Sequence, residues 1–171
     1  EVGKLTGKLS WENGSSFTDF DTNMWQIGLR MEEPYYSGRV AGLGKDGSFE
    51  VKDILFGTYD VMVYSEYSNA YVNVGTITID SKTKSRDFVI SGYAVHVKMV
   101  DSDGNPMKGE QFSFVNTDET DTKYFCTNTE GEAYLIVSKP GTYKAMLRKE
   151  SYGTVTVTDK NVSAILRKSE P

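Results

Sequence analysis

The sequence is poor in the residue types on which most catalytic and metal-binding sites depend. Its 171 residues include one cysteine and one histidine. A single cysteine cannot form an intramolecular disulfide, and it cannot supply the several thiolates of a structural zinc site. A single histidine leaves few arrangements for a nucleophilic triad or a histidine-based metal centre. We therefore predict no cofactor, no metal site and no catalytic residues.

Basic charge and long apolar runs are also scarce. Lys and Arg number 19 against 24 Asp and Glu, which gives a formal net charge of −5. Nucleic-acid-binding domains carry a basic face that neutralises phosphates, so we expect no nucleic-acid partner. The longest apolar stretches, such as Tyr134–Val137, cover a few residues, whereas a membrane-spanning helix needs about 20. We expect no membrane insertion by this segment.

One stretch of the sequence occurs twice. Residues 46–63 and 130–147 align without a gap. Each segment begins with an acidic residue followed by Gly, and each has Gly-Thr-Tyr at the same aligned position. The two segments thus share a turn, a strand, a second turn and a second strand. This indicates that one supersecondary unit is used twice. We therefore predict two domains, residues 1–91 and 92–171.

Apolar residues alternate with polar residues along most of the chain. The pattern is clear at Leu5–Trp11, Trp25–Met31, Val95–Met99 and Tyr143–Leu147. A period of two gives each strand one buried and one solvated face. Turns rich in Gly, Asn and Asp separate about seven such strands in each half, and a slip in the alternation predicts a β-bulge at Gly75. The predicted fold class is all-β, with two consecutive β-sandwiches.

Four large aromatic residues are predicted to belong to the cores of these sandwiches. Trp11 and Trp25 fall on the apolar phase of their strands. Tyr59 and Tyr143 end the two Gly-Thr-Tyr turns, and their repetition indicates a scaffold role. We expect each of these two tyrosines to be a buried ring with its hydroxyl bound to the backbone, as in a tyrosine corner.

Two segments of the second half form a further pattern, in which a strand and an Asp-rich turn precede a closing Pro-Gly-x-Tyr strand. The segments are Val97–Gly109 (VKMVDSDGNPMKG) and Thr127–Leu147 (TNTEGEAYLIVSKPGTYKAML). Through them, most of residues 93–168 resembles the Cna B-type and carboxypeptidase-regulatory-like modules of bacterial surface proteins. The first half resembles them through fewer residues. The resemblance implies tandem transthyretin-like or Ig-like β-sandwiches, outside the cell or on its surface.

Modules of that family often carry an isopeptide bond between a Lys and an Asn, assisted by an acidic residue. The resemblance places Lys98 at the position of the lysine. The closing strand, Val162–Leu166, has no Asn in its interior, since Asn161 precedes it, and Leu147 stands where the acid belongs. The alternation turns Lys98 toward solvent, opposite Val97, because an uncompensated lysine in the core would be costly. We therefore expect no crosslink.

Three acidic segments place oxygen atoms close together, as a calcium-binding loop does. They are residues 19–23, 101–105 and 118–121. In the second segment, Pro106 and Phe112 stand where an EF-hand loop needs its glycine and its bidentate glutamate. Asp and Asn also bind their own backbone in tight turns. We interpret all three segments as turns, with cation binding as the alternative.

The remaining chemically active side chains give little sign of catalysis. His96 has only Lys98 beside it on its strand face, so we interpret it as an ordinary surface histidine. Cys126 falls in a predicted strand and is interpreted as a small buried residue. Asp and Glu are plentiful, but no pair stands out for glycoside hydrolysis. We predict that the chain is not an enzyme; the enzyme alternative requires a concave cluster of carboxylates.

Tyrosines in predicted loops are the candidate binding residues: Tyr35, Tyr36, Tyr67, Tyr71 and Tyr152. A tyrosine ring combines an apolar face with a polar hydroxyl, which suits a loop-borne binding surface and the stacking of sugar rings. The sequence does not identify the ligand that these tyrosines would bind.

Two functions remain open at this point. The first is a non-catalytic structural or adhesive module of a bacterial cell-surface or secreted protein, with ligand contact through the Tyr-rich loops. The second is a carbohydrate-binding module of a glycan-capture or glycan-degradation system. Expected partners are other domains of the parent protein, with a glycan or a host or neighbouring protein as ligand. Self-assembly, as in a pilin, is a further alternative. The chain begins at Glu1, so we expect a processed or excised segment.

Overall fold

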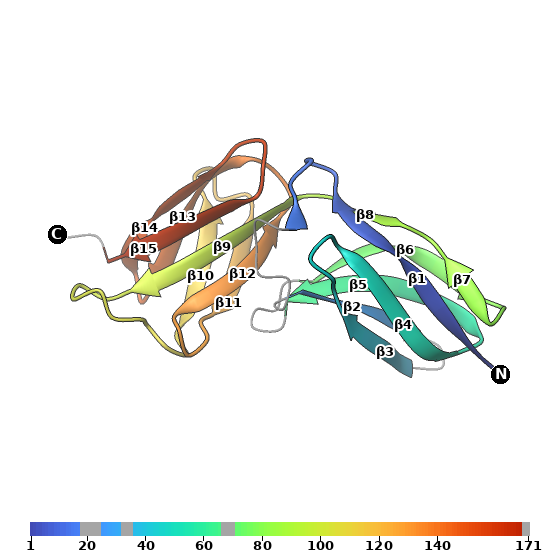
Figure 1. Cartoon of the computed structure of the whole chain (residues 1–171). Helices are drawn as coiled ribbons and strands as arrows, with labels where there is room; N and C mark the ends of the chain where they lie inside the picture. The colour runs from blue at the N-terminus through green and yellow to red at the C-terminus, as the bar shows by residue number, and fades with distance from the viewer. Residues whose placement is uncertain (18–24, 32–35, 66–70, 169–171) are drawn as a thin grey trace. The chain divides into compact units, whose positions relative to one another are not determined.

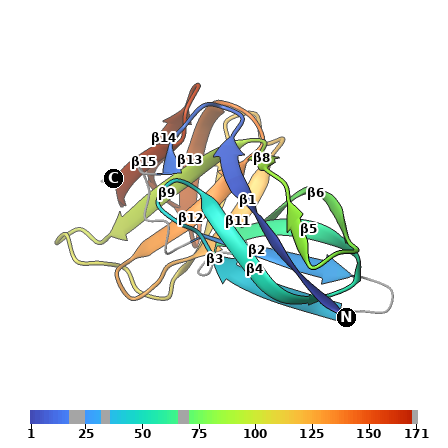
Figure 2. The same ribbon diagram turned by 45° about the vertical axis from the view of Figure 1, so that its right-hand side comes forward.

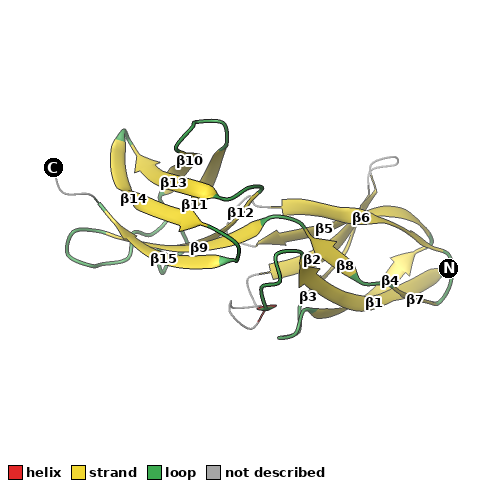
Figure 3. Cartoon of the chain, turned by 90° about the horizontal axis from the view of Figure 1, so that it is seen from above, coloured by secondary structure: helices red, strands yellow, loops and turns green. Residues whose placement is uncertain are grey.

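Most of the described residues lie in β-strands, and the others form turns and loops (Figures 1 and 3). The computed structural model describes residues 1–17, 25–31, 36–65 and 71–168, without the side chains of residues 36–40. No α-helix occurs among these residues, and none of them forms a helix long and apolar enough to span a membrane. The predicted all-β fold class is confirmed.

Fifteen strands are present in the described part of the chain. In order they are β1 (Val2–Trp11), β2 (Trp25–Met31), β3 (Tyr36–Gly42), β4 (Ser48–Leu55), β5 (Gly57–Ser65), β6 (Tyr71–Ile79), β7 (Thr83–Ser85), β8 (Phe88–Ile90), β9 (Tyr93–Val100), β10 (Gln111–Asn116), β11 (Thr122–Cys126), β12 (Glu132–Val137), β13 (Gly141–Leu147), β14 (Glu150–Val157) and β15 (Val162–Arg167).

The strands form two compact units, and the chain passes from one to the other between Ser91 and Gly92. We call the described residues up to Ser91 unit 1 and those from Gly92 onward unit 2. Strand β8 ends at Ile90 and β9 begins at Tyr93, so two residues connect the units. That each unit folds as an independent domain stays a prediction.

The two units share one strand topology, which can be followed in Figures 1 and 2. Unit 1 has one sheet with the order β4-β1-β7, in which β8 also pairs with β1, and a second sheet with the order β3-β2-β5-β6. Unit 2 repeats this arrangement as β12-β9-β15 and β11-β10-β13-β14. The duplication therefore extends from the 18-residue sequence repeat to the whole unit. Unit 1 has one strand more because its last strand is divided into β7 and β8.

The predicted alternation of apolar residues places the core of each unit between its two sheets. In unit 1, Leu5, Leu9 and Trp11 of β1 are at most 4% exposed, and Trp25 of β2 is fully buried. The rings of Trp11 and Trp25 meet edge to face, with centroids 5.8 Å apart, so both tryptophans are core residues as expected. The core of unit 2 is built in the same way around Val95, Val97, Met99, Phe112, Phe114, Phe125, Leu135 and Tyr143.

The predicted bulge at Gly75 is present. Val61 of β5 is opposite Gly75, but the next residue, Met62, is opposite Asn73, so β6 contains one residue more than β5 at this point. The extra residue shifts the phase of the strand, and Ile77 and Ile79 are buried beyond it. Gly75 has a φ of 151°, a backbone conformation that residues with a Cβ atom rarely adopt.

The two Gly-Thr-Tyr turns form the same hydrogen bonds in both units. The Tyr59 hydroxyl donates to the carbonyl oxygen of Leu55 at 2.7 Å, and the Tyr143 hydroxyl donates to that of Lys139 at 2.8 Å. Both rings are buried, with at most 1% exposed. The expectation of a buried ring bound to the backbone is confirmed for both tyrosines. Each hydroxyl ties a strand to the turn that precedes it.

We expect Tyr59→Phe and Tyr143→Phe to destabilise unit 1 and unit 2, respectively, by about 1–2 kcal/mol each, because each change leaves a partly buried carbonyl without its donor. Urea denaturation of the whole chain measures this. Tyr124→Phe is the matched control, since Tyr124 is 59% exposed. Equal stability of all three variants and the unmodified chain would contradict the scaffold role of the two hydroxyls.

Candidate functional site

The structure describes only part of the predicted binding surface. Tyr35 and Tyr67 lie outside the described residues, and Tyr36 begins β3 without a described side chain. Tyr71 begins β6, and its side chain is 66% exposed. Of the described side chains among the predicted binding residues, Tyr71 alone is thus available to a ligand. Its role in binding stays a prediction.

A second tyrosine lies beside Tyr71 on the same face of the sheet. Tyr64 of β5 is the direct cross-strand partner of Tyr71, and Gln26 of β2 is the partner of Tyr64 on its other side. The Tyr64 ring covers Gly28, where an added Cβ would lie 3.1 Å from its Cε1 atom. Burial raises the pKa of the Tyr64 hydroxyl. Two tyrosines and an amide therefore form a row across one sheet of unit 1, which we call the tyrosine row.

Tyr64 is close in sequence to the predicted binding residues Tyr67 and Tyr71 but is not among them. Tyr64 lies inside a strand, two residues from Met62 and on the same face. Its outward phase was visible in the sequence, as it alternates with the buried Val63 and Ser65. Its position beside Tyr71 depends on the register between β5 and β6, which a period of two does not by itself specify.

Tyr152 was expected in an exposed turn, and this placement is wrong. Its side chain is 6% exposed, and its ring packs edge to face on Phe112 with the centroids 5.2 Å apart. The turn lies earlier, at Arg148 and Lys149, which have φ values of 51° and 70°. Neither residue is Gly or Asn, so the usual sequence signal for such a hairpin turn is absent. Tyr152 therefore falls inside β14 and in the core of unit 2.

His96 is more enclosed than a surface histidine, which corrects the sequence interpretation. Its side chain is 21% exposed. The ring stacks on Tyr134 of β12 with centroids 4.4 Å apart, and its Nδ1 atom lies 3.2 Å from the Ser163 hydroxyl of β15. Its Nε2 atom lies 3.6 Å from Oε1 of Glu132. The three strands β12, β9 and β15 each contribute to this group, which we call the His96 cluster.

The His96 cluster combines a hydroxyl, an imidazole and a carboxylate, but its geometry is not that of a nucleophilic triad. A triad needs hydrogen bonds at both ring nitrogens. The contact between Nε2 and Glu132 is longer than a hydrogen bond. Tyr134, His96 and Ser163 lie in one register row, so the cluster links three neighbouring strands of one sheet. The sequence could not reveal it because the members that come from different strands are 29 or more residues apart.

The enclosure of His96 predicts a specific pH dependence. Burial lowers the pKa of His96 from its ordinary value of 6.5, opposed by Glu132 and reinforced by Lys98. The unfolded chain therefore binds the proton at a higher pH than the folded chain. The stability of unit 2 should fall as the pH is lowered through about 6.5, and the loss should end below the pKa of the folded state.

Denaturation of unit 2 between about pH 8 and pH 5 checks this expectation. His96→Gln should remove the dependence, because glutamine does not titrate in this range. Unit 1 contains no histidine, so its transition serves as an internal reference. Identical pH profiles for unit 2 in the variant and the unmodified chain would show that His96 is not the responsible group.

The acidic segment 101–105 is a turn, as interpreted from the sequence. Oδ1 of Asp101 accepts hydrogen bonds from the backbone N–H groups of Asp103 and Asn105, both at 2.9 Å. Gly104 follows with a φ of 85°, and its N–H donates to the Asp101 carbonyl oxygen. The carboxylate thus caps its own loop rather than projecting toward a cation.

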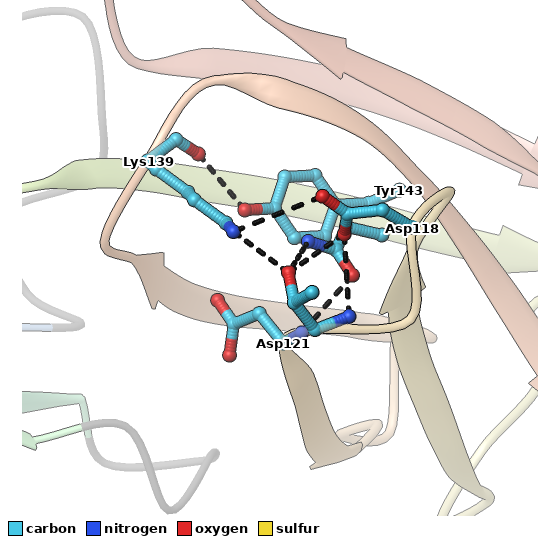
Figure 4. A network of polar contacts seen from close by, with 6 residues as sticks. Asp118, Asp121, Lys139 and Tyr143 are labelled. Carbon is cyan, nitrogen blue, oxygen red and sulfur yellow. Dashed lines mark hydrogen bonds and ion pairs between the residues drawn. The ribbon is translucent and has the colours of Figure 1, made fainter.

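The segment 118–121 belongs to a polar network that already contains a cation (Figure 4). The Lys139 ammonium donates to the Thr120 hydroxyl at 2.7 Å and lies 4.0 Å from Oδ2 of Asp118. Asn116 donates to the same hydroxyl at 2.9 Å. Hydrogen bonds from Thr120 hold the pKa of Asp118 below its usual value. The Asp118 carboxylate and the Thr120 hydroxyl are thus engaged within the protein, whereas the buried Oδ2 atom of Asp121 has no hydrogen-bond partner among the described residues.

No metal site emerges from the described residues. They include no group of three or more His, Cys, Asp or Glu side chains that could hold a metal ion. The third acidic segment, residues 19–23, lies outside the described residues. Cation binding there stays the untested alternative.

The positions of Lys98 and Asn161 exclude a crosslink between them. Oδ1 of Asn161 accepts a hydrogen bond from the Ala94 N–H at 2.8 Å, at the beginning of β9. Lys98 is level with Ile165, four residues further along the same strand. At about 3.3 Å per residue, the two side chains start roughly 13 Å apart along the strand. The expectation that no such bond forms therefore follows from the strand register.

Cys126 is exposed, which corrects the interpretation of a buried residue. It lies on β11, where Phe125 is the residue that faces the core. The period of two then directs Cys126 outward together with Tyr124. The apolar run Tyr124–Cys126 hid this phase, because all three side chains are of types that occur in cores.

Comparisons with known proteins do not identify the chain. No family model and no curated protein matches its sequence. Among solved structures it resembles the Bacillus anthracis TIE protein, at 13% identity and a TM-score of 0.36, over 98% of this chain and 34% of that one. It also resembles the shaft pilin SpaA from Lactobacillus rhamnosus GG, at 8% identity and a TM-score of 0.36, over 98% of each chain. A Streptococcal ancillary pilin matches at 13% identity and a TM-score of 0.37, over 98% and 69% of the two chains. The chain spans about a third of the first of these proteins, and similarity at this level assigns no function.

Proposed function

We propose that the chain is a pair of consecutive β-sandwich domains, residues 1–91 and 92–171, that serves as a non-catalytic structural module of a bacterial surface or secreted protein. The proposal includes the membership of both domains in the Cna B-type or carboxypeptidase-regulatory-like group, on the sequence resemblance. Its partners are the other domains of the parent protein, which it positions and spaces. Its location is extracellular or at the cell surface.

One observation carries the structural role. In each unit the first and last strands are neighbours in one sheet and run in the same direction, β1 with β8 and β9 with β15. The chain therefore enters each unit at one end of the sheet and leaves at the opposite end. A module built in this way adds the length of its strands to the chain. The ten residues of β1 alone correspond to about 33 Å.

The proposal requires each unit to fold without the other. We expect residues 1–91 and 92–171, expressed separately, to unfold cooperatively and to keep most of the stability of the same unit in the whole chain. Urea denaturation followed by tryptophan fluorescence for unit 1, which contains both tryptophans, and by circular dichroism for unit 2, measures this. An unfolded fragment in either case would mean that the chain is one joint folding unit rather than a pair of modules.

A second candidate function, carbohydrate binding, is favoured by the tyrosine row. Tyr71 is 66% exposed and lies directly beside Tyr64, with Gln26 next in the row. Tyrosine rings offer apolar faces on which sugar rings stack, and an amide side chain hydrogen-bonds hydroxyl groups. In this form of the proposal, the module contributes ligand contact to its parent protein through a sheet face as well as through loops.

A screen of the purified chain against soluble and insoluble glycans tests this second function. If the tyrosine row binds sugars, Tyr71→Ala should weaken binding about five- to thirtyfold, since loss of a stacking ring costs on the order of 1–2 kcal/mol. Tyr124→Ala is the matched control, because Tyr124 is similarly exposed on unit 2. Absence of saturable binding to every glycan would leave the structural role alone.

A further inference from the structure

The first and last strands of unit 2 form an uninterrupted parallel ladder. Six consecutive residue pairs, from Val95 with Val162 to Val100 with Arg167, join β9 to β15 without a register shift. The hydrogen bond from the Ala94 N–H to Asn161 extends the connection by one position. The ladder joins the first strand of the unit directly to the last.

The direction of the strands determines how this ladder meets a stretching force. A pull on the two ends of unit 2 acts on the start of β9 and on the end of β15. Because the strands are parallel, the pull slides them past one another along their length. All the hydrogen bonds of the ladder then carry the load together. Had the pull acted on the same end of both strands, the bonds would break one after another.

We propose that the parallel pairs formed by the first and last strands are mechanical clamps, which resist unfolding when the ends of each unit are pulled apart. This inference rests on the proposed spacer function, since a spacer between other domains is loaded through its ends. Resistance to force is a property of the unfolding rate and need not follow the equilibrium stability.

Side chains reinforce the clamp of unit 2 on both faces. On the inner face, Leu166 of β15 is 6% exposed and belongs to the core, together with Val95 and Val97 of β9. On the outer face, the contact of 3.2 Å between His96 and Ser163 spans the two strands. The His96 cluster therefore lies on the clamp, and sliding of β15 along β9 would break it.

The clamp of unit 1 is divided. Residues Lys4–Thr6 pair with β7, and Leu9–Trp11 pair with β8, with three residue pairs in each segment. Between them, the N–H of Lys8 donates to Oδ1 of Asp87 at 2.9 Å, so a side-chain oxygen replaces a backbone acceptor. Gly7 permits the close passage, because a Cβ there would collide with the carbonyl oxygen of Arg86. The carboxylate of Asp87 bridges the gap in the ladder.

Single-molecule pulling on the whole chain tests the clamp of unit 2. Two variants are compared, and both carry Cys126→Ser so that the handles attach only at introduced cysteines. One is held at Ser91→Cys and at a cysteine added after Pro171, which slides β9 past β15. The other is held at Ser91→Cys and Asp159→Cys, which pulls the starts of the two strands apart. The first geometry should require at least about twice the unfolding force of the second at one loading rate. Equal forces would overturn the proposal.

Unit 1 provides a test by side-chain change. The chain is held at a cysteine added before Glu1 and at Ser91→Cys, again with Cys126→Ser. Asp87→Ala should lower the unfolding force of unit 1, while Asp87→Asn, which keeps an acceptor oxygen, should retain most of it. If Asp87→Ala leaves the force unchanged, the bridging role is wrong. These failures differ from failure of the spacer function, since both units can fold separately and still yield at low force.

Discussion

The pairing of the first strand of each unit with its last strand is the interaction on which the rest of the structure depends. Strand β9 lies between β12 and β15, and β1 lies between β4 and the divided strand β7 and β8. Until the last strand is added, one edge of the first strand is left open. The pairing joins residues far apart in sequence, as Val95 and Val162 illustrate. Closure of such a contact costs more chain entropy than a hairpin does, and we expect it to come late in folding.

The same pairing connects local chemistry with the proposed role. The side chains that surround the ladder in unit 2 are the core residues on one face and the His96 cluster on the other. An enclosed imidazole that links two strands has a structural purpose, which accounts for its burial without any catalytic step. In unit 1, Asp87 performs the linking at the one place where the backbone cannot. His96 and Asp87 thus both contribute to holding strands together.

Duplication explains why two dissimilar halves share so many details. The Gly-Thr-Tyr turn retains its tyrosine hydroxyl bond, and the strand that follows retains a cross-strand threonine pair, Thr58 with Thr78 and Thr142 with Thr156. Each unit also has a bulge in its corresponding strand, at Gly75 and near Gly153. The tyrosine bonds and the bulges concern backbone geometry, where few residue types are acceptable, whereas core residues can exchange if their total volume is kept.

Local patterns in the sequence determined the fold class, the duplicated turn, the bulge at Gly75 and the core positions of both tryptophans, because each depends on neighbouring residues and a period of two. The Asp101 turn followed in the same way from the affinity of aspartate for its own backbone. Tyr152 and Cys126 were misplaced where a hairpin turn lacked Gly and Asn and where an apolar run concealed its phase. Only the tertiary structure decided which residues of different strands meet: Tyr64 with Tyr71, His96 with Ser163 and Glu132, and Lys8 with Asp87. Those contacts depend on strand order and register, which arise from the packing of the whole unit rather than from any single segment.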